Sequence, residues 1–489
     1  MNDDQVINPH ERDEALRLEK LAKLKSRSAL PYRFDRTHTN IEIVNNFESL
    51  ASNHQLVKTA GRLIAKREHG KTVFGHIIDQ TAKIQIYFRK DFLMQSFDDL
   101  ALVDIGDILG VAGEVFKTKT NEITILVKSF TVLNKSLHTL PEKWHGLRDI
   151  ETKYRQRHLD LIANPESKKI MQTRSQLISL LRKFFDDKGY LEFETPILQP
   201  IYGGAAARPF ETYYNVLEQK MFLRISDELY LKRLIIGGFD KVYEIGKDFR
   251  NEGIDRFHSP EFTQLEAYEA YKDYNDMMAL VEELFQFLSL QLFQTLVINY
   301  QDISIDFSKP WKRLDFCTAL NQKIGCDILS TDPKQIETKA IELGVLDKST
   351  YPRPTFAKLL DKLFSQLVQK ELMEPTFVID HPKVTTPLAR THRNNPLLVE
   401  RFEPIICGIE IGNAFSELND PIEQRKRFEE QLARQEDYAV LDEDFIKAME
   451  YGMPPTAGLG LGIDRIVMLF TNSDSIRDVI SFPQLRKSE

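Results

Sequence analysis

The sequence of 489 residues is poor in the features that mark several protein classes. It holds three cysteines, Cys317, Cys326 and Cys407, an odd number with no CxxC pair, so it supports neither a disulfide framework nor a structural zinc site. No apolar run approaches the roughly 20 residues that a membrane-spanning helix needs. The first residues, MNDDQVINPHER, lack the basic lead and apolar core of a secretory signal. We therefore expect a cytoplasmic protein that does not enter a membrane.

Positive charge is also scarce, because 65 lysines and arginines face 73 acidic residues and give a formal net charge of −8. This balance excludes a uniformly basic protein, but a local basic surface is enough to bind nucleic acid. The hydrophobic fraction of 42% and the charged fraction of 28% are those of a globular protein. The length is sufficient for two or three domains.

The stretch 249–268, FRNEGIDRFHSPEFTQLEAY, is typical of two alternating strands joined by a polar loop. Because strand side chains alternate between faces, each strand presents its polar and aromatic residues together. On the shared faces lie Arg250 and Glu252 from the first strand, and Phe262, Glu266 and Tyr268 from the second. Such a face makes a poor half of a hydrophobic core and a good floor for a small charged ligand.

These residue types fit an activated nucleotide beside an amino acid. Arg250 offers a planar fork of donors to a phosphate, and Phe262 offers a flat face to a purine. Glu252 can accept a hydrogen bond from an exocyclic amine, and His258 in the loop can reach a distal phosphate. A hairpin with a merely solvated face explains the alternation about equally well, so this stretch alone leaves both interpretations open.

Two later stretches carry further polar patterns. In residues 400–420, a hairpin that turns near Cys407 and Gly408 would place Glu403 and Glu410 on neighbouring strands, an arrangement that suits magnesium. Three alternating residues then share one face: Asn413, Phe415 and Glu417. In GLGLGIDRIVMLF (458–470), a glycine at every second position clears one strand face for a nucleotide, and Arg465 lies at the start of the following helix. Solvated acidic residues and an ordinary glycine-rich turn are the alternatives.

Together these stretches resemble the class II aminoacyl-tRNA synthetases, in the form carried by bacterial-type lysyl-tRNA synthetases. FRNEG with HSPEFTQLE resembles motif 2 of that class, ETPIL (194–198) resembles motif 1, and GLGLGIDRIVMLF resembles motif 3. The resemblance runs from about residue 10 to the C-terminus. It implies an α+β fold, with an antiparallel-sheet catalytic domain, an N-terminal OB-fold β-barrel and a homodimer formed through the motif 1 helix and strand.

The resemblance also implies an enzyme that uses ATP and Mg²⁺ to activate L-lysine and to transfer it to the 3′ end of tRNA(Lys). The expected catalytic residues are Arg250 and Arg465. The expected ATP-binding residues are Arg250, Glu252, His258, Phe262 and Arg465. The expected lysine-binding residues are Gly204, Glu228, Glu266, Tyr268, Asn413, Phe415 and Glu417. The expected metal ligands are Glu403 and Glu410.

The side-chain pocket decides among related enzymes. An aspartate site should offer a cation, whereas this chain offers Glu228, Glu266 and Glu417, which suit an ammonium group. There are four alternatives: an aspartyl- or asparaginyl-type tRNA ligase, a protein-lysylating ligase, a related asparagine synthetase and a non-catalytic tRNA-binding protein. The second and third normally lack the N-terminal barrel. The last would be expected to have lost Arg250, Arg465 or Glu410.

The chain is expected to divide into an N-terminal helical extension (1–54), an anticodon-binding barrel (55–140), a linker (141–166) and a catalytic domain (167–489) with a helical insertion at about 302–386. Within these, 11–27 is predicted to be helical, Ser167 to cap a helix and YLEFETPIL (190–198) to form a strand. In the barrel, exposed aromatic and cationic groups suit unpaired bases, and our candidates are Arg62, Phe74 and Gln85.

The match has departures from the family pattern. The family commonly has arginine immediately before the loop histidine, where this chain has Phe257, and Arg256 lies one place earlier. Arg256 is therefore left out of the predicted site. Ser259 replaces the usual asparagine, and Ile409 precedes Glu410 where bacterial relatives often have arginine. None of these changes removes a charge that the expected chemistry needs.

Overall fold

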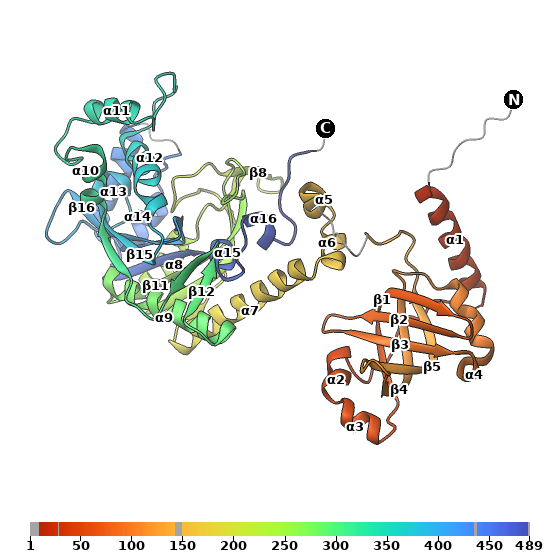
Figure 1. The fold of residues 1–489 in the computed structure, drawn as a ribbon. Helices are drawn as coiled ribbons and strands as arrows, with labels where there is room; N and C mark the ends of the chain where they lie inside the picture. The colour runs from red at the N-terminus through yellow and green to blue at the C-terminus, as the bar shows by residue number, and fades with distance from the viewer. Residues whose placement is uncertain (1–8, 28, 142–148, 435–437, 488–489) are drawn as a thin grey trace. The chain divides into compact units, whose positions relative to one another are not determined.

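The computed structural model describes residues 9–27, 29–141, 149–434 and 438–487 (Figure 1). The chain divides into two compact units, Met1–Arg148 and Asp149–Glu489. Among the helices in these ranges, none is long and apolar enough to cross a bilayer.

The first unit is a closed barrel with the strand order β1-β2-β3-β5-β4. Its strands are β1 (Val57–His69), β2 (Thr72–Ile78), β3 (Lys83–Arg89), β4 (Ile108–Lys117) and β5 (Ile123–Asn134). Its helices are α1 (Pro9–Arg27), α2 (Asn40–Asn45), α3 (Phe47–Ser52), α4 (Lys90–Leu93) and η1 (Met94–Leu102). In β2, Val73 and Ile77 are buried inside the barrel while Phe74 and His76 alternate onto the outer face. The predicted N-terminal helix and the predicted barrel are both confirmed.

The second unit is built on a mostly antiparallel sheet with the order β14-β15-β16-β18-β19-β11-β10-β6, in which β17 also pairs with β16. The strands of this sheet are β6 (Leu191–Glu192), β10 (Lys241–Phe249), β11 (Glu261–Ala270), β14 (Lys312–Asp315), β15 (Thr376–Pro382), β16 (Leu398–Ile406), β17 (Ile409–Glu410), β18 (Gly412–Ser416) and β19 (Thr456–Gly462). Two smaller sheets contain β7 (Leu198–Gln199), β8 (Phe210–Tyr214) and β9 (Gln219–Leu223), and β12 (Val297–Tyr300) and β13 (Ile303–Asp306). The predicted α+β class is confirmed.

The helices of the second unit lie on both faces of this sheet. They are α5 (Ile150–Arg155), α6 (Arg157–Ala163), α7 (Pro165–Asp187), α8 (Glu228–Ile236), α9 (Tyr274–Phe293), α10 (Phe316–Ile324), α11 (Pro333–Glu342), α12 (Phe356–Leu367), η2 (Gln369–Glu371), η3 (Lys383–Thr385), α13 (Pro421–Ala433), α14 (Glu443–Met449), α15 (Ile463–Phe470) and α16 (Ile476–Val479).

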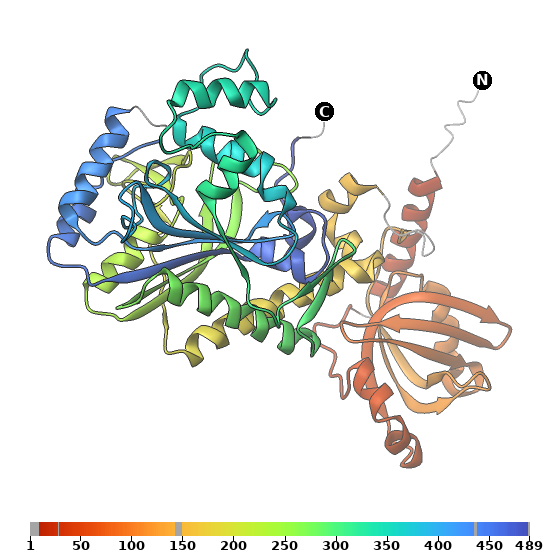
Figure 2. The same ribbon diagram turned by 60° about the vertical axis from the view of Figure 1, so that its left-hand side comes forward.

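Strand β11 separates two different packing environments. Helices α7 and α9 run side by side on one face (Figure 1 and Figure 2), where Phe285 of α9 shares a core with Leu265 and Ala267 of β11. Helix α8 packs on the opposite face, where its Leu231 contacts the cluster that contains Tyr268. The alternation of β11 therefore turns its apolar residues into the main core and its polar residues toward α8, as the sequence predicts.

The first strand of the central hairpin is shorter than predicted. Strand β10 ends at Phe249, so Arg250 and Glu252 belong to the loop and do not share a strand face. The backbone N–H of Arg250 donates to the carbonyl of Pro260 (2.8 Å), and that of Glu252 donates back to the carbonyl of Arg250 (2.8 Å). This tight turn ends the alternation immediately after the strand.

The predicted linker is also different in structure. Residues 142–148 lie outside the described residues, and the second unit begins at Asp149, before the predicted start at residue 167. The buried guanidinium of Arg157 binds α6 into this unit, because it donates to backbone carbonyls of residues 477, 480 and 481. Ser167 is not a helix cap: α7 begins at Pro165, and the Ser167 hydroxyl donates to Asp160 (3.0 Å).

Two predicted segments have different boundaries. The predicted strand 190–198 forms only the two-residue strand β6 and the first residue of β7, because Pro196 lies between them and cannot donate to a ladder. The predicted helical insertion at 302–386 begins and ends with strands: β14 and β15 belong to the main sheet. Its helical part is the group α10, α11 and α12, whose apolar residues pack against Val378, Leu398 and Ile405 at that end of the sheet.

Candidate active site

A cavity of about 760 Å³ opens on the face of the main sheet that carries α8. The predicted site residues of this unit line it with one exception. Those that line it are Gly204, Glu228, Arg250, Glu252, His258, Phe262, Glu266, Tyr268, Glu410, Asn413, Phe415, Glu417 and Arg465. Glu403 is the exception. The fold thus brings together residues that lie far apart in the sequence.

The hairpin loop supplies a cationic and aromatic part of the cavity wall. The guanidinium of Arg250 lies 5.0 Å from the centroid of the Phe262 ring, a distance at which a cation is attracted to the aromatic face. The Arg250 Nε lies 3.4 Å from the carbonyl of Ile225. Glu252 is exposed in the same loop. Arg250, Glu252 and Phe262 all line the cavity.

A second cationic group connects the loop with the start of α15. The Nε2 atom of His258 accepts a hydrogen bond from Arg465 (3.1 Å), while its Nδ1 atom lies 2.7 Å from the Asp255 carboxylate. These partners fit the neutral imidazole with its proton on Nδ1. Arg465 also donates to the backbone carbonyl of Glu410 (2.7 Å). The loop histidine and the helix arginine therefore form one unit at the mouth of the cavity.

At two glycines of the site, neighbouring side chains leave no space for a Cβ atom. A Cβ at Gly458 would lie 2.0 Å from Glu417 Oε1 and 2.5 Å from the ring of Tyr268. A Cβ at Gly204, whose φ is +85°, would lie 2.7 Å from the hydroxyl of Ser226. Glu417 and Tyr268 therefore fill the space beside Gly458, and Gly458, Gly460 and Gly462 all line the cavity.

The inner end of the cavity is acidic. Glu266 is 4% exposed and accepts hydrogen bonds from Ser226 (2.9 Å), Gln264 (2.7 Å) and Tyr268 (2.9 Å). Burial, together with the neighbouring carboxylates, raises the pKa of Glu266 to about 7. Burial raises the pKa of Glu417 to about 8, against the opposing charge of Lys232. A cation bound beside either carboxylate would compensate for the hydration that the charged group loses on burial.

Sequence reasoning missed a buried lysine next to these carboxylates. The Nζ of Lys232 lies 2.5 Å from Glu228 Oε1 and also forms an ion pair with Glu417. Its signal in the sequence is the four-residue spacing from Glu228, which places both side chains on one face of α8.

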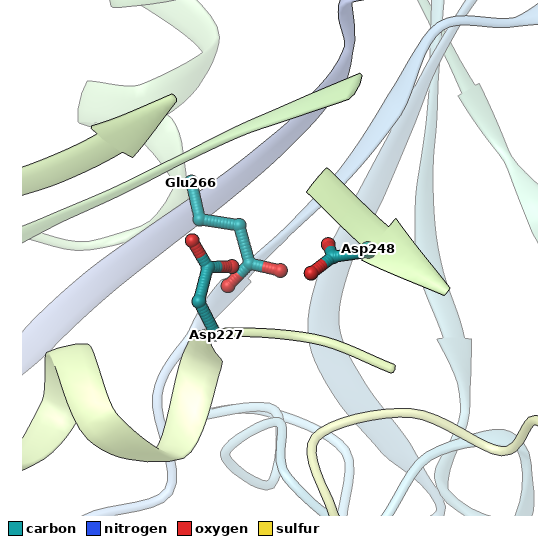
Figure 3. A group of neighbouring side chains, drawn as sticks. All are labelled: Asp227, Asp248 and Glu266. Carbon is teal, nitrogen blue, oxygen red and sulfur yellow. The ribbon is translucent and has the colours of Figure 1, made fainter. Parts of the chain in front are cut away.

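Two further acidic residues lie behind Glu266. Asp227, Asp248 and Glu266 offer oxygen atoms within 4.8 Å of one another, and Figure 3 shows their carboxyl groups converging from α8, β10 and β11. Burial and the charge of Glu266 raise the pKa of Asp227 well above its ordinary value. Asp248 pairs with the buried Arg224 (3.0 Å). Neither aspartate was predicted, because each stands beside ordinary core positions in the sequence.

Of the two predicted metal ligands, Glu410 lines the cavity and Glu403 does not. Glu410 is opposite Ile405 of β16, and Glu403 forms an ion pair with Arg401 (2.5 Å). Partial burial and the charge of Glu403 raise the pKa of Glu410. Asp361, which sequence reasoning missed because it comes from α12 of the inserted segment, lines the cavity and is near enough to interact with both glutamates. These carboxylates are donors that Mg²⁺ accepts.

The predicted barrel residues lie on the outer face of β1, β2 and β3. Phe74 stacks on Tyr87 with ring centroids 4.3 Å apart. Gln85 donates to Glu122 (2.8 Å), which is not among the predicted residues. Arg62 is opposite Ile78, four positions along β2 from Phe74, and its guanidinium donates to the carbonyl of Gly106 (2.8 Å). Phe74 and Gln85 therefore share one patch, whereas Arg62 is held elsewhere on the barrel.

A family model described as "tRNA synthetases class II (D, K and N)" matches residues 149–486. The chain belongs to this family. A second model, described as "OB-fold nucleic acid binding domain", matches residues 57–133 and covers the barrel strands. The predicted class II fold with an N-terminal OB-fold is thereby confirmed.

Relatives of this class II synthetase cover nearly the whole chain. A lysine–tRNA ligase of Carboxydothermus hydrogenoformans is 50% identical over 479 residues, which are 96% of this chain and 97% of the relative. A lysine–tRNA ligase of Aquifex aeolicus is 52% identical over 89% of this chain and 74% of the relative. One of Methanoculleus marisnigri is 48% identical over 96% and 94%.

The shifted loop arginine of this class II synthetase has its own partner. Arg256 pairs with Asp474 at 3.1 Å and donates to the backbone carbonyl of the same residue. Phe257, not Arg256, lines the cavity. The ion pair and the backbone hydrogen bond tie Arg256, and with it the loop, to Asp474.

Proposed function

We propose that this protein is a lysine–tRNA ligase, which activates L-lysine with ATP to lysyl-adenylate and transfers it to the 3′ end of tRNA(Lys). The observation that carries the proposal is the placement of Glu228, Glu266 and Glu417 in one cavity with Arg250 and Arg465. A buried carboxylate cluster suits an ammonium group, and the guanidinium groups suit a triphosphate. Relatives named lysine–tRNA ligase over nearly the full length support the same conclusion.

In the proposed reaction, a carboxylate oxygen of lysine attacks the α-phosphorus of ATP, and pyrophosphate leaves. No side-chain nucleophile is required, so the protein acts by positioning and by stabilising charge. Arg250 would hold the α-phosphate, while the adenine lies on Phe262 beside Glu252. The linked His258 and Arg465 would hold the distal phosphates.

Glu403 and Glu410 are proposed to hold magnesium, because paired carboxylates on one side of a phosphate site are suitable ligands. A bound Mg²⁺ neutralises charge on phosphate oxygens. In this chain Arg401 holds Glu403 in place through their ion pair. The carboxylate of Glu410 lies beside Arg465, with 3.7 Å between the charged atoms, so the metal ligands and the phosphate-binding arginine are adjacent.

Lysine is proposed as the amino acid because the inner cavity holds more carboxylates than an anionic or neutral side chain can compensate. Both oxygens of Glu417 are buried and lack a hydrogen-bond partner within the described ranges, although Oε2 pairs with Lys232, so the carboxylate has unused capacity to accept a hydrogen bond. Shorter homologues such as ornithine would be discriminated weakly, since one methylene is worth about 1–3 kcal/mol.

The remaining partners are inferred from the same family. We propose that the barrel binds the anticodon of tRNA(Lys) and that the enzyme is a homodimer that uses the segment around motif 1. The exposed apolar side chains of Ile197 and Leu198 in that segment fit an interface. A cytoplasmic location stays a prediction.

The function is tested by ATP–pyrophosphate exchange with each of the common amino acids offered in turn. We expect exchange with lysine and none with aspartate or asparagine. Charging of tRNA(Lys) transcripts with radioactive lysine would then measure the transfer step. Exchange that depends on aspartate or asparagine and not on lysine would overturn the assignment of substrate.

The lysine site should depend on pH because Glu266 and Glu417 titrate in an accessible range. With a pKa of about 7 for Glu266 and about 8 for Glu417, both hold protons at pH 6 that an ammonium ligand must displace. We expect the KM for lysine in pyrophosphate exchange to rise roughly tenfold or more between pH 8.5 and pH 6, since each pH unit below a pKa lowers the ionised fraction about tenfold. The KM for ATP, measured in parallel, should change less.

The outer face of the barrel should contribute to tRNA affinity. Phe74→Ala removes a stacking surface, and one base–aromatic contact is worth about 1–3 kcal/mol. We expect the KM for tRNA in aminoacylation to rise about tenfold while lysine-dependent pyrophosphate exchange is unchanged. Phe92→Ala, at an exposed aromatic of α4, is the matched control. Equal tRNA KM values for the two variants would remove Phe74 from the interface.

A further inference from the structure

The buried side chain of Lys232 occupies an unusual position relative to the cavity. It is fully buried and does not line the cavity, although Glu228 and Glu417 do. Its ammonium group reaches both carboxylates from the protein side, at 2.5 Å from Glu228 and in an ion pair with Glu417. The lysine belongs to α8, whereas Glu417 follows β18 from a distant part of the chain. Lys232 therefore connects two walls of the proposed lysine site.

The charge of the site depends on this lysine. Burial alone would lower the pKa of Lys232, but the charges of Glu228 and Glu417 outweigh burial and raise it, so the ammonium form is retained. When Glu228, Glu266 and Glu417 are ionised, these three side chains and Lys232 together carry a charge of −2, while Asp227, Asp248 and Arg224 form a separate buried group behind Glu266. Free lysine carries two ammonium groups, one on Cα and one at the end of its side chain. Two ammonium groups would balance the charge of −2 on these four side chains, and the substrate carboxylate is the group that attacks ATP in the proposed reaction.

We propose that Lys232 is a specificity-determining and positioning residue of the lysine site, which holds Glu228 and Glu417 together and sets their charge to match a ligand with two ammonium groups. This inference rests on the proposed function. Lys232 does not touch the substrate; it acts through the two carboxylates. Both carboxylate oxygens of Glu417 are buried without a hydrogen-bond partner among the described residues, and Oε2 forms the ion pair with Lys232.

An ordinary internal ion pair is the competing explanation, since buried pairs are often replaceable by apolar residues at little cost in stability. The two explanations differ in what happens to pH dependence. Glu417 faces Lys232 and Glu228 from α8, and Glu266 and Tyr268 from β11. Lys232 is the only cation in this set. Its removal would raise the proton affinity of Glu228 and Glu417, the two glutamates with which it pairs. A purely structural lysine would leave the pH profile of lysine binding unchanged.

The test compares Lys232→Met with wild type in lysine-dependent pyrophosphate exchange. We expect the KM for lysine to rise at least tenfold at pH 7.5, with the KM for ATP changed less than twofold. The lysine KM should fall as the pH rises and then become constant. In Lys232→Met we expect the pH at which it becomes constant to be higher by one unit or more. Lys241→Met is the matched control, because Lys241 is a partly buried lysine paired with Glu269 (2.9 Å) away from the cavity.

A second variant keeps the proposal testable if Lys232→Met does not fold. In Lys232→Met/Glu417→Gln one positive and one negative charge are removed together, so the remaining glutamates again carry −2. We expect this double variant to fold, and its lysine KM to be no higher than that of Glu417→Gln alone. If the two substitutions act independently, so that the double variant raises the lysine KM by the product of the two single effects, the proposal is overturned. An unchanged lysine KM and pH profile in a folded Lys232→Met would overturn it as well.

The wild-type enzyme separates the two levels of inference. If wild type shows no lysine-dependent exchange, the proposed function fails. If wild type shows it and Lys232→Met binds lysine with the same KM and pH profile, only the role of Lys232 fails.

Discussion

Arg250→Gln is expected to lower kcat for lysine-dependent pyrophosphate exchange by about 100- to 1,000-fold, the usual cost of removing one preorganised donor to a developing negative charge. The guanidinium lies beside the Phe262 ring and is not bound in an ion pair in the described part of the chain, so its donors are available to a phosphate. Glutamine retains a polar group but cannot offer the charged, bidentate fork. Thermal unfolding of the variant should differ little from that of wild type.

Arg256→Gln provides the control for this prediction. Arg256 lies in the same loop and pairs with Asp474 outside the cavity lining. Its replacement is expected to change kcat less than threefold, because a half-exposed ion pair contributes at most about 1 kcal/mol. Equal losses in the two variants would show that the loop as a whole, and not the charge of Arg250, supports the reaction.

The fold could be predicted wherever the pattern is local. The period-two alternation of β1 to β5 predicts the barrel, and that of β11 correctly separates Leu265 from Tyr268. The ends of the predicted insertion could not be found in this way. Strand β14 pairs with β15, and β15 with β16, through contacts between segments far apart in the sequence. A four-residue strand such as β14, with the sequence KRLD, carries no local sign of such a partner.

The site shows the same division. The hairpin and the glycine-rich strand contain motifs that identify Arg250, His258 and Arg465 from the sequence. Lys232 has no such motif, because a glutamate and a lysine four residues apart on a helix are usually an exposed pair. It becomes a buried bridge only when Glu417 arrives beside it from the end of β18. The functional meaning of the spacing is therefore set by the tertiary structure.

Glu266→Gln is expected to raise the KM for lysine at least 30-fold at pH 8. Loss of one partner from a buried, hydrogen-bonded charge pair costs about 2–5 kcal/mol. The amide is isosteric with the carboxylate: its oxygen can still accept from Ser226, and its NH2 group can donate to the hydroxyl oxygen of Tyr268, so the cavity keeps its shape. Glu269→Gln is the control, because Glu269 is on the same strand, binds Tyr190 (2.7 Å) and does not line the cavity.

Glu266→Gln should make the ligand-free protein more stable at pH 8 although it weakens lysine binding. Because burial raises the pKa of Glu266 from 4.5 to about 7, the folded protein holds a proton that the unfolded chain releases, and stability contributed by this group falls as the pH rises from about 4.5 through 7. Without the carboxylate this loss disappears, so ligand-free Glu266→Gln should unfold at a higher temperature than wild type at pH 8 and at a similar temperature at pH 5. A variant that is more stable without ligand yet binds lysine more weakly would identify Glu266 as a group kept for binding at a cost in stability. A variant that is less stable at pH 8 and binds lysine normally would contradict both parts of this prediction.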